Sequence, residues 1–394
     1  MKRIKSATAF LWLALLAALS ARTLWNLAHA PSAKDAEGAG FSERLHGRLL
    51  ESCAFHDEMI HLYGGWARAS RRSVCNGVFR HPSGMLVNTY LAPVDATGRA
   101  HSLKALLDVL APEGRSLLYV QLPRKIDRES EMLPRGFAQD FSHESIDGFL
   151  KALDSSGVPF LDVREMLDST PEDVQRNFFK TDHHWSFDGA FKVFPKIAEA
   201  LALSAGAESD DIATYVSPDA WERKRLPRRF LGYDGRRTGV LFAGTDEMFY
   251  YVPRFKTAIS MTVPRQEVSR EGVFEKSVMN FLHAAKPSSM LRDGGYLIYG
   301  NNFDHVTYVN ALAPVKKRIL VAKDSFSIPL VAWLATIFER VDALDFRHYD
   351  KMTLAEAART FESDVVAVMH NPAPVMGRRD KLWNFCGQKR GMKQ

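Results

Sequence analysis

The stretch Ile319-Leu320-Val321-Ala322-Lys323-Asp324-Ser325-Phe326 decides how this chain is expected to fold. Its first four residues form a compact apolar run, which is typical of a strand buried in a parallel sheet. A turn at Asp324 and Ser325 follows, and residues 328–338 are then expected to form a helix. In open α/β sheets, active sites gather at the edge where strands end, and the free N–H groups of a helix N-terminus can stabilise an oxyanion there. Ser325 is therefore a candidate nucleophile.

The same alternation of strand and helix occurs on both sides of this stretch. Apolar residues recur at helical spacing in some segments and form short compact runs in others. This rhythm predicts an α/β fold in which helices cover a mostly parallel sheet. Strands are expected at residues 84–90, 116–122, 158–163, 341–346 and 364–369. Helices are expected at 102–110, 142–153 and 187–203, the last with a kink or restart at Pro195. A further helix is expected to begin at a capping box formed by Thr353 and Glu356 and to end at about residue 361.

The rhythm changes between about residues 204 and 292. Glycine, proline and arginine become frequent, and aromatic and β-branched residues cluster, as in Met248-Phe249-Tyr250-Tyr251-Val252. We interpret this segment as an irregular insertion with several short strands, forming a hairpin-rich flap. The sequence then predicts one large domain over residues 81–394 that carries the insertion, preceded by a linker and N-terminal extension at 31–80.

Composition sets broad limits on function. The chain has 394 residues, of which 46% are hydrophobic and 25% charged, so its composition is that of an ordinary globular protein with a large core. The net charge of +6 is modest, and basic runs such as Arg223-Lys224-Arg225 are interpreted as solvated surface before any binding role. No nucleic-acid-binding motif is present in the sequence, and no nucleic-acid partner is expected.

The N-terminus has the pattern of a secretory signal. Lys2, Arg3 and Lys5 precede an apolar run over residues 7–19, and Ala28-His29-Ala30 has the small-x-small form of a cleavage site. The apolar run is short for a membrane-spanning helix, which needs about 20 residues. Residues 1–30 are therefore a cleaved signal peptide or an uncleaved signal anchor. Either reading predicts an exported protein that is periplasmic or anchored to the inner membrane facing the periplasm.

Cysteine usage and ligand spacing point to no disulfide scaffold and no metal. There are three cysteines, so pairing of Cys53 with Cys75 and three unpaired thiols including Cys386 both stay open. His183 and His184 are adjacent and follow Asp182, but no cysteine or second carboxylate cluster accompanies them. We expect neither a metal nor a small-molecule cofactor.

A second stretch, Thr181-Asp182-His183-His184-Trp185, complements the serine motif. A serine hydroxyl is a weak nucleophile that needs a histidine to take its proton, and the histidine needs a carboxylate to hold its tautomer. Asp182 and His184 are two residues apart, which on a loop places both side chains in one cleft. Together with Ser325 they supply the three parts of a hydrolase or acyltransferase site in the order Asp, His, Ser.

Each of these residues also has a simpler structural explanation. Ser325 at the start of a helix is more often a cap than a nucleophile. The motif with two histidines is also consistent with a polar loop in which Trp185 anchors the core. His183 is a rival base, because adjacent side chains on an extended segment point opposite ways and only one of them should face the serine. Spacing alone does not choose between His183 and His184.

The two motifs together resemble those of a known family. The resemblance is to the DHHW proteins, which are similar to the SGNH-hydrolase-like proteins of alginate O-acetylation, and it spans roughly residues 80–370. The residues that carry it are Thr181 to Ser186 with Gly189-Ala190-Phe191, Leu320 to Phe326 with Pro329, Leu334 and Leu344-Asp345-Phe346-Arg347, and, in the insertion, Phe230-Leu231-Gly232, Gly235 and Pro253-Arg254-Phe255.

This resemblance implies an SGNH-hydrolase-like three-layer α/β/α fold with the serine motif late in the chain. It assigns Asp182, His184 and Ser325 to the catalytic roles, with His183, Trp185 and Asp324 as motif neighbours. Lys323 stands where the SGNH enzymes with an early serine motif have glycine. The resemblance does not assign the asparagine that would stabilise the oxyanion; the candidates are Asn301, Asn302, Asn310 and Asn371. Asn310 is favoured by its spacing before the serine strand, and Asn301 is retained as a further candidate. Arg347 is a weaker candidate for holding substrate or an anion.

The function expected from these observations is an exported serine-dependent acyl-handling enzyme. The first hypothesis is an O-acetyltransferase that acts on a cell-surface or secreted polysaccharide and receives acetyl groups from a membrane-bound acyl donor protein. An esterase with the same triad shares the first half-reaction, so the residues do not separate the two. A polysaccharide-binding or assembly factor that retains the fold without catalysis is the third hypothesis.

Overall fold

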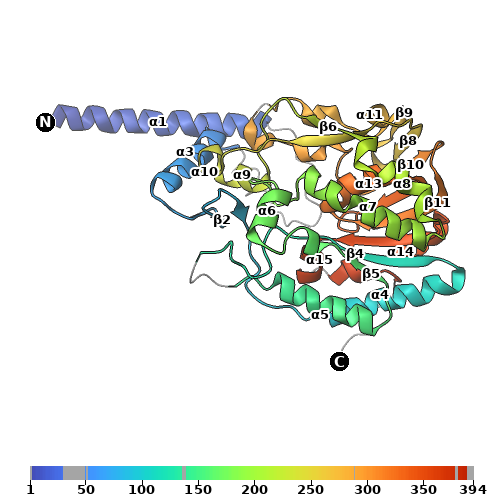
Figure 1. Ribbon diagram of the computed structural model, residues 1–394. Helices are drawn as coiled ribbons and strands as arrows, with labels where there is room; N and C mark the ends of the chain where they lie inside the picture. Colours follow the sequence, from blue (N-terminus) through green and yellow to red (C-terminus); the bar gives the residue numbers. More distant parts are fainter. Residues whose placement is uncertain are drawn as a thin grey trace.

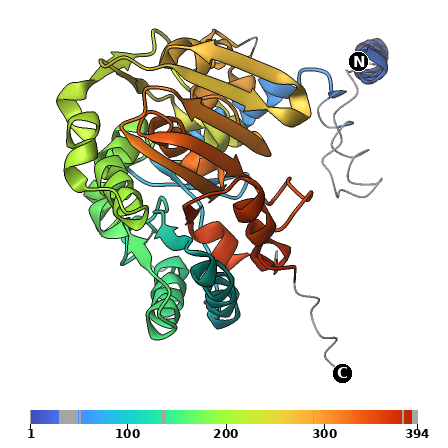
Figure 2. The ribbon, with the colours of Figure 1, turned by 90° about the vertical axis from the view of Figure 1, so that its right-hand side faces the viewer.

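A computed structural model of the chain describes residues 2–29, 49, 52–134, 139–287, 289–377 and 380–387. One long N-terminal helix projects from a body in which helices lie on both faces of a central sheet (Figure 1). The view turned by 90° shows the same layers, with the N-terminal helix seen end-on beside them (Figure 2). The expected linker at residues 31–40 and Ala30 of the expected cleavage site lie outside the described residues.

The central sheet has eight strands in the order β5-β4-β13-β11-β12-β10-β8-β9. The first five are mutually parallel, whereas the last three join in antiparallel pairs. The expected α/β fold with a mostly parallel sheet is therefore confirmed. The strands are β4 (Ser116–Gln121), β5 (Phe160–Asp162), β8 (Ile259–Val263), β9 (Val268–Gly272), β10 (His305–Asn310), β11 (Val315–Lys323), β12 (Phe338–Leu344) and β13 (Val365–His370).

Two cores cover the two faces of this sheet. In β11, Ile319 and Val321 belong to one core, and Leu320 and Ala322 belong to the other. Because successive side chains of a strand point to opposite faces, a strand buried on both sides must be apolar throughout, which explains the run Ile319–Ala322. The first core holds α7 (Phe187–Ser204) and α13 (Ile328–Leu334), and the second holds α4 (Thr97–Leu110), α5 (Ser142–Ser155) and α14 (Leu354–Thr360).

The structure corrects the expected boundary after the serine motif. Helix α13 ends at Leu334 rather than at residue 338, because Phe338 pairs with Val315 and begins β12. Short apolar runs fit helix and strand equally well, and here the neighbouring strand decides. The strand expected at 84–90 is limited to β3 (Leu86–Val87), and α7 runs through Pro195 without restarting.

The segment at 204–292 is partly built into the central sheet. Strands β8 and β9 extend that sheet, while β6 (Trp221–Arg225) and β7 (Phe249–Pro253) form a separate antiparallel pair. The remaining helices of this segment are α8 (Ser209–Val216), α9 (Tyr233–Thr238), α10 (Val240–Ala243), α11 (Phe274–Ser277) and α12 (Phe281–Ala284).

The N-terminal part packs against this segment. Helix α3 (His56–Ala69) contacts α9 and α10, and a small sheet of β1 (Val74–Cys75), β2 (Val78–Arg80) and β3 follows it. Cys53, Cys75 and Cys386 are all free, so the expected alternative of a Cys53–Cys75 disulfide is not formed in this structure. Among the described residues, one helix, α1 (Lys2–His29), is long and apolar enough to cross a membrane: its window Phe10–His29 has a mean hydropathy of 1.4.

Candidate active site

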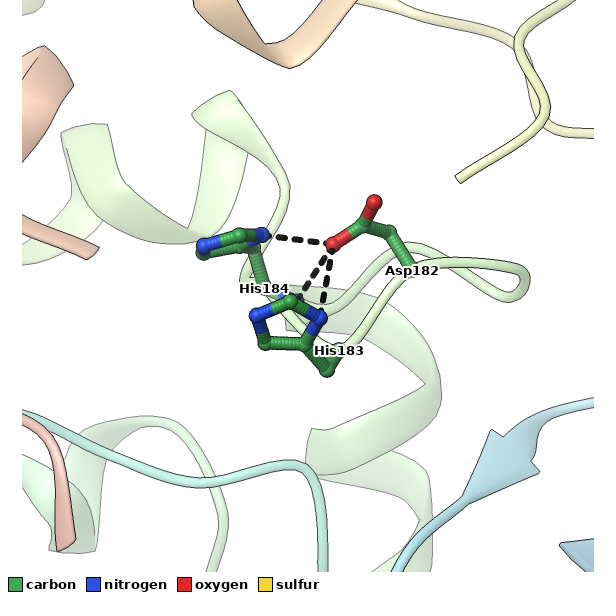
Figure 3. Close-up of side chains that lie close together, drawn as sticks. All are labelled: Asp182, His183 and His184. Carbon is green, nitrogen blue, oxygen red and sulfur yellow. Dashed lines mark hydrogen bonds and ion pairs between the residues drawn. The ribbon is translucent and has the colours of Figure 1, made fainter. Parts of the chain in front are cut away.

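The fold brings the two sequence motifs into direct contact. Ser325 is the first residue of a 3₁₀ turn, η7 (Ser325–Ser327), that follows β11, and the other motif lies on the loop between α6 (Pro171–Asn177) and α7. Nε2 of His184 is 2.8 Å from Oγ of Ser325 across 141 residues of sequence. Nδ1 of His184 is 2.6 Å from Oδ1 of Asp182, as the side chains in Figure 3 show. The three residues therefore form a continuous hydrogen-bonded chain.

Asp324, rather than Ser325, caps the turn that follows the strand. Its Oδ1 accepts a hydrogen bond of 2.9 Å from the N–H of Phe326, and its Oδ2 accepts one of 2.7 Å from the N–H of Asn371. Because the buried Asp324 carboxylate meets the capping requirement, the hydroxyl of Ser325 is left to His184. The capping interpretation of Ser325 is thus not what the structure shows.

Trp185 connects the two motifs through the core. Its indole is fully buried, and its Nε1–H donates a 3.0 Å hydrogen bond to the carbonyl of Phe326, directly after the serine. The aromatic ring of Phe326 in turn lies 4.8 Å from the ring of His184. Trp185 is therefore a core anchor, as one interpretation of the motif held, and it also ties the loop that carries His184 to the turn that carries Ser325.

Both oxygens of Asp182 are occupied. Oδ1 accepts from Nδ1–H of His184 and, at 3.0 Å, from the backbone N–H of the same residue, while Oδ2 accepts a 2.7 Å hydrogen bond from the N–H of Tyr233. The chain approaches so closely that a Cβ on Gly232 would lie 2.2 Å from Cβ of Asp182. A segment of the insertion thus fixes the carboxylate that orients the base.

Two further charged residues hold the same loop. Asp246 accepts hydrogen bonds from the backbone N–H groups of Lys180 and Thr181, at 2.7 and 2.8 Å. From the other side, Nζ of the buried Lys125 donates to the carbonyls of Lys180 and Asp182, at 2.7 and 2.6 Å. Burial lowers the pKa of Lys125 to about 8, although the neighbouring carboxylates oppose this change. The acid–base loop is therefore held in place by bonds to its backbone.

The electrostatic setting keeps the base neutral. Burial, assisted by His183, lowers the pKa of His184 to about 4, although Asp182 opposes this change. Burial would raise the pKa of Asp182, but the charges of the two imidazoles and the hydrogen bonds from His184 outweigh it and hold that pKa well below its usual range. Near neutral pH, His184 is uncharged with its proton on Nδ1 facing the Asp182 carboxylate, so Nε2 can accept the serine proton.

His183 lies beside the triad without contacting the nucleophile. Its Nδ1 is 3.5 Å from Oδ1 of Asp182, and its ring lies 3.9 Å from the ring of His184 (Figure 3). The expectation that the two imidazoles point opposite ways is therefore wrong, because the segment is a bent loop rather than an extended strand. The choice between them is still clear, since it is His184 that reaches Ser325.

Asn310, the leading oxyanion candidate, lies away from the site. His305, at the start of β10, pairs with Leu344, and Leu344 pairs on its other side with Ala322, three residues before Ser325. Asn310 is five residues after His305 in β10, so the two residues are about 17 Å apart at the usual strand spacing. Its side-chain amide donates to the carbonyl of Thr336, and its side-chain carbonyl accepts from a backbone N–H nearby. The assignment of Asn310 to the oxyanion is therefore corrected: the spacing matched, but the strand runs antiparallel.

Asn301 lies close to the end of the serine strand without contacting the triad. Its Oδ1 accepts a 2.8 Å hydrogen bond from the N–H of Asn302, whose own Oδ1 accepts a 3.0 Å bond from Nζ of Lys323. Lys323, the residue that replaces glycine in the motif, is thus a buried lysine that ties this loop to β11. Asn301 is linked to the serine strand through Asn302 and Lys323.

Arg347, the weaker candidate for holding substrate or an anion, lies near Asp324, the residue before Ser325. Its guanidinium is held by Asp345, with Nε 2.8 Å from Oδ1, and its charge contributes to lowering the pKa of His184. Arg347 and Asp324 line a pocket of about 310 Å³. A fixed positive charge in that pocket suits an anionic or strongly polarised ligand group.

A second pocket, of about 210 Å³, lies on the other side of the serine motif. His183, Tyr233 and Phe326 are among the residues that line it. Asn371 and Ala373 line both pockets, so the two form a continuous surface that passes the end of the serine strand. Ser325 itself lines neither pocket, but its neighbour Phe326 lines the second and its neighbour Asp324 lines the first.

The cluster of Asp182, His183 and His184 also offers three ligand atoms that lie within 4.8 Å of one another. Ligands at about 2.0–2.1 Å from a tetrahedral zinc ion stand roughly 3.3 Å apart. The 2.6 Å between Nδ1 of His184 and Oδ1 of Asp182 is instead a hydrogen-bond distance. As arranged here, the cluster matches an acid–base pair better than a metal centre.

Several supporting residues were not recognised from the sequence. Lys125, Asp246 and Tyr296 all support the acid–base loop or the imidazole, and Tyr296 stacks on His184 with ring centroids 3.9 Å apart. None of them lies in a motif, so spacing carried no signal for them. Gly232 was the exception, since it belongs to the Phe230-Leu231-Gly232 run that was noted for the family resemblance.

Comparison with known proteins bears on the fold. Residues 87–231 match a protein-family model described as the SGNH hydrolase-like domain of the acetyltransferase AlgX. The fold is SGNH hydrolase-like. The match includes Asp182 and His184 and ends before the insertion reaches Gly232, and it confirms the family resemblance noted in the sequence. No sequence among the curated proteins matches this chain significantly.

Solved structures share the SGNH hydrolase-like fold over most of the chain. PatB1 of Bacillus cereus superposes with a TM-score of 0.64 at 20% identity, covering 78% of this chain and 99% of that one. PatB1 with a sulfonyl adduct gives a TM-score of 0.63 at 21% identity, covering 78% and 97%. A DHHW family protein from Eubacterium siraeum gives 0.61 at 17% identity, covering 79% and 96%.

Proposed function

We propose that this protein is an exported serine-dependent O-acetyltransferase that acts on a cell-surface or secreted polysaccharide. The observation that carries the proposal is the hydrogen-bonded chain from Asp182 through His184 to Ser325, within a domain similar to that of an acetyltransferase family. A neutral imidazole with its free nitrogen 2.8 Å from a serine hydroxyl is the arrangement that acyl transfer through a covalent intermediate requires.

In the first half-reaction, Oγ of Ser325 attacks the carbonyl carbon of the acetyl donor while its proton moves to Nε2 of His184. The Asp182 carboxylate stabilises the imidazolium that forms. The tetrahedral intermediate collapses by breaking the bond to the leaving group, which takes the proton from Nε2. The acetyl group is then an ester on Oγ of Ser325.

In the second half-reaction, a sugar hydroxyl gives its proton to Nε2 of His184 as its oxygen attacks the ester carbonyl. Collapse breaks the bond between the acetyl carbon and Oγ, and Ser325 regains its proton from the imidazolium. Water in place of the sugar would make the protein an esterase. Two pockets that share Asn371 and Ala373, and whose linings include Phe326 and Asp324 on either side of Ser325 in the chain, would offer separate places for donor and acceptor, which favours transfer.

The proposed location follows from α1. Its exposed apolar window Phe10–His29 would anchor the protein in the inner membrane, with the catalytic domain in the periplasm. Acetyl-CoA is cytoplasmic, so a membrane-bound acyl donor protein would have to supply the acetyl group. The proposed partner is therefore a membrane-bound protein that donates acyl groups.

The test is acetyl transfer from a chromogenic acetyl ester, measured with and without an oligosaccharide acceptor. We expect wild-type protein to form acetylated oligosaccharide, and Ser325→Ala and His184→Gln to form none. His183→Gln should retain most activity, since His183 does not reach the serine. Ser327→Ala is the matched control, because its hydroxyl donates to the carbonyl of Met369 instead.

Two results would contradict the proposal. Wild-type transfer that survives Ser325→Ala would remove the nucleophile. Ester hydrolysis that depends on Ser325, combined with no acetylated product at any acceptor concentration, would establish the esterase instead. Labelling by a sulfonyl fluoride, followed by mass spectrometry of the modified peptide, checks independently which hydroxyl is activated.

A further inference from the structure

The outer face of α3 is apolar and exposed. Phe55, Met59, Leu62, Tyr63 and Trp66 are each between 42% and 67% exposed. Their spacing of three and four residues puts them on one face of the helix. Single exposed apolar residues are common on protein surfaces, but four on one short helix, with Phe55 directly before it, form a patch that marks an interaction site. We call these five residues the α3 face.

The opposite side of α3 is tightly packed, so this face is not a core surface that has come loose. A Cβ on Gly64 would lie 2.0 Å from the carbonyl oxygen of Thr238, and one on Gly65 would lie 2.9 Å from the side chain of Leu241. Ala67 is fully buried on the same side. Glycine and alanine thus let α3 lie directly against α10, which turns the α3 face outward.

The chain immediately before α3 is bound to the end of α1. The N–H of Ala54 donates a 3.0 Å hydrogen bond to Oγ1 of Thr23, and the side-chain amide of Asn26 donates at 3.2 Å to the carbonyl of Ser52. Figure 1 shows α1 projecting from the body with its N-terminus outermost and α3 beside its inner end. The chain leading into α3 thus meets α1 within the last two turns of its apolar window Phe10–His29, near one surface of a membrane that α1 would cross.

The charges around the α3 face suit lipid headgroups. Arg68, Arg71 and Arg72 are exposed at the end of the helix, and the Arg72 guanidinium lies 4.3 Å from the ring centroid of Trp66. Asp57 is turned away to form hydrogen bonds with Ser289 and His56. Tryptophan and tyrosine with adjacent arginines are typical of helices at the membrane interface, where the rings enter the headgroup layer and arginines meet anionic lipids.

We propose that α3 lies in the outer surface of the phospholipid bilayer that α1 crosses, with the α3 face inserted among the headgroups. The inference rests on the proposed anchoring by α1. It adds that the catalytic domain has a fixed orientation on the membrane instead of moving freely on a tether. The pockets beside Ser325 would then stay at a constant distance from any acyl donor held in the same bilayer.

The test uses the full chain in vesicles of phosphatidylcholine and phosphatidylglycerol whose acyl chains are brominated. The difference in tryptophan fluorescence between the wild type and Trp66→Phe gives the emission of Trp66. The difference between the wild type and Trp12→Phe gives the emission of Trp12, which lies inside the apolar window of α1. We expect brominated lipid to quench both components and the Trp66 emission to shift to the blue. Met59→Gln with Leu62→Gln should abolish the quenching of Trp66 only.

The control is Leu203→Gln, which changes an exposed leucine at the end of α7 and should alter neither component. Quenching of Trp12 without quenching of Trp66 would overturn the inference and leave the anchor in place. Quenching of neither would overturn the anchor as well. A Trp66 that is shielded from both brominated lipid and aqueous acrylamide would show that a protein surface covers the α3 face, which also overturns the inference.

Discussion

His184 combines two properties that a general base needs. It is buried, which keeps it uncharged well below neutral pH, and it is fixed on one side by Asp182 and on the other by Ser325. Tyr296 stacks on its ring at an interplanar angle of 15° and excludes water from that side. The difference between His184 and His183 is therefore one of surroundings and not of residue type.

The fall in kcat/KM at acid pH, the acid limb of the profile, is expected to reflect the protonation of His184. Because the base must be neutral, acetyl-ester turnover should be constant near neutral pH and fall as the pH drops through about 4. His183 contributes to lowering this pKa, so His183→Gln should move the limb to higher pH. The measurement is kcat/KM against pH, with the exposed His101→Gln as the control. A limb that stays in place in His183→Gln would contradict the electrostatic account.

At the scale of elements, the site depends on close approach between segments that are far apart in sequence. The loop before α7 is bounded by the insertion at Gly232 and Asp246 and by the turn after β4 at Lys125. Trp185 then ties this loop to η7. Backbone groups make most of these contacts, which is why they hold the loop rigidly and leave few traces in the side-chain pattern.

Gly232→Ala should impair both stability and activity. The added methyl would lie between 2.2 and 2.6 Å from three atoms of Asp182, so the carboxylate must move. A displacement of about 1 Å in a catalytic group costs on the order of 100-fold in rate. Gly148→Ala in α5 is the matched control, since its Cβ meets nothing within 4 Å and helical alanine gains about 0.5–1 kcal/mol over glycine. Equal kcat values for the two variants would refute the role of close approach.

Trp185→Phe separates anchoring from general packing. The substitution removes the shorter of two hydrogen bonds to the Phe326 carbonyl and leaves the 3.5 Å bond from the Tyr296 hydroxyl; the net loss of one such bond costs about 0.5–1.5 kcal/mol. We expect kcat to fall as well, because Phe326 follows the nucleophile. Trp383→Phe removes a similar 3.2 Å bond, to the carbonyl of Pro374, in the other core, and should cost stability alone. Urea unfolding and kcat, measured for both variants, check this; matching effects on kcat would count against it.

At the scale of the whole molecule, two buried histidines make stability depend on pH. His184 and His370 both lie in the interior, where burial lowers the pKa of each to about 4. Among the described residues, no hydrogen-bond partner lies near Nδ1 of His370. The folded protein therefore binds fewer protons than the unfolded chain in mildly acidic solution.

The free energy of unfolding should accordingly be highest above pH 6.5 and fall as the pH drops toward 4. The depressed pKa of His370 contributes stability that is present above the unfolded value of 6.5 and lost through the folded value of about 4, a change of about 3 kcal/mol. His370→Gln should flatten this slope. Unfolding by urea at several pH values, compared with His101→Gln, measures it; an unchanged slope in His370→Gln would argue against the account.

Much of this architecture could be predicted from local pattern. The strand Ile319–Ala322 and the cap on α14 could be predicted because they depend on neighbours in sequence. The candidate triad was assigned from two separate motifs and the family resemblance, since its members lie up to 141 residues apart. The prediction that Asn310 stabilises the oxyanion was wrong for a definite reason. Its spacing before the serine strand did not show that β10, the strand that carries Asn310, runs antiparallel to its neighbour β12. The sequence of the insertion did not show that its strands β8 and β9 extend the central sheet beyond β10.

The sequence by itself determined the chemical types at the site and the alternation of strand and helix that carries them, because both are properties of adjacent residues. The family resemblance already favoured His184 over His183, and the tertiary structure showed that His184 contacts Ser325; only the tertiary structure decided that Asp324 takes the capping role. It also decided that Lys125, Gly232 and Asp246 hold the loop. These outcomes depend on contacts between segments up to 141 residues apart, and such contacts form only when the shared core brings the segments together.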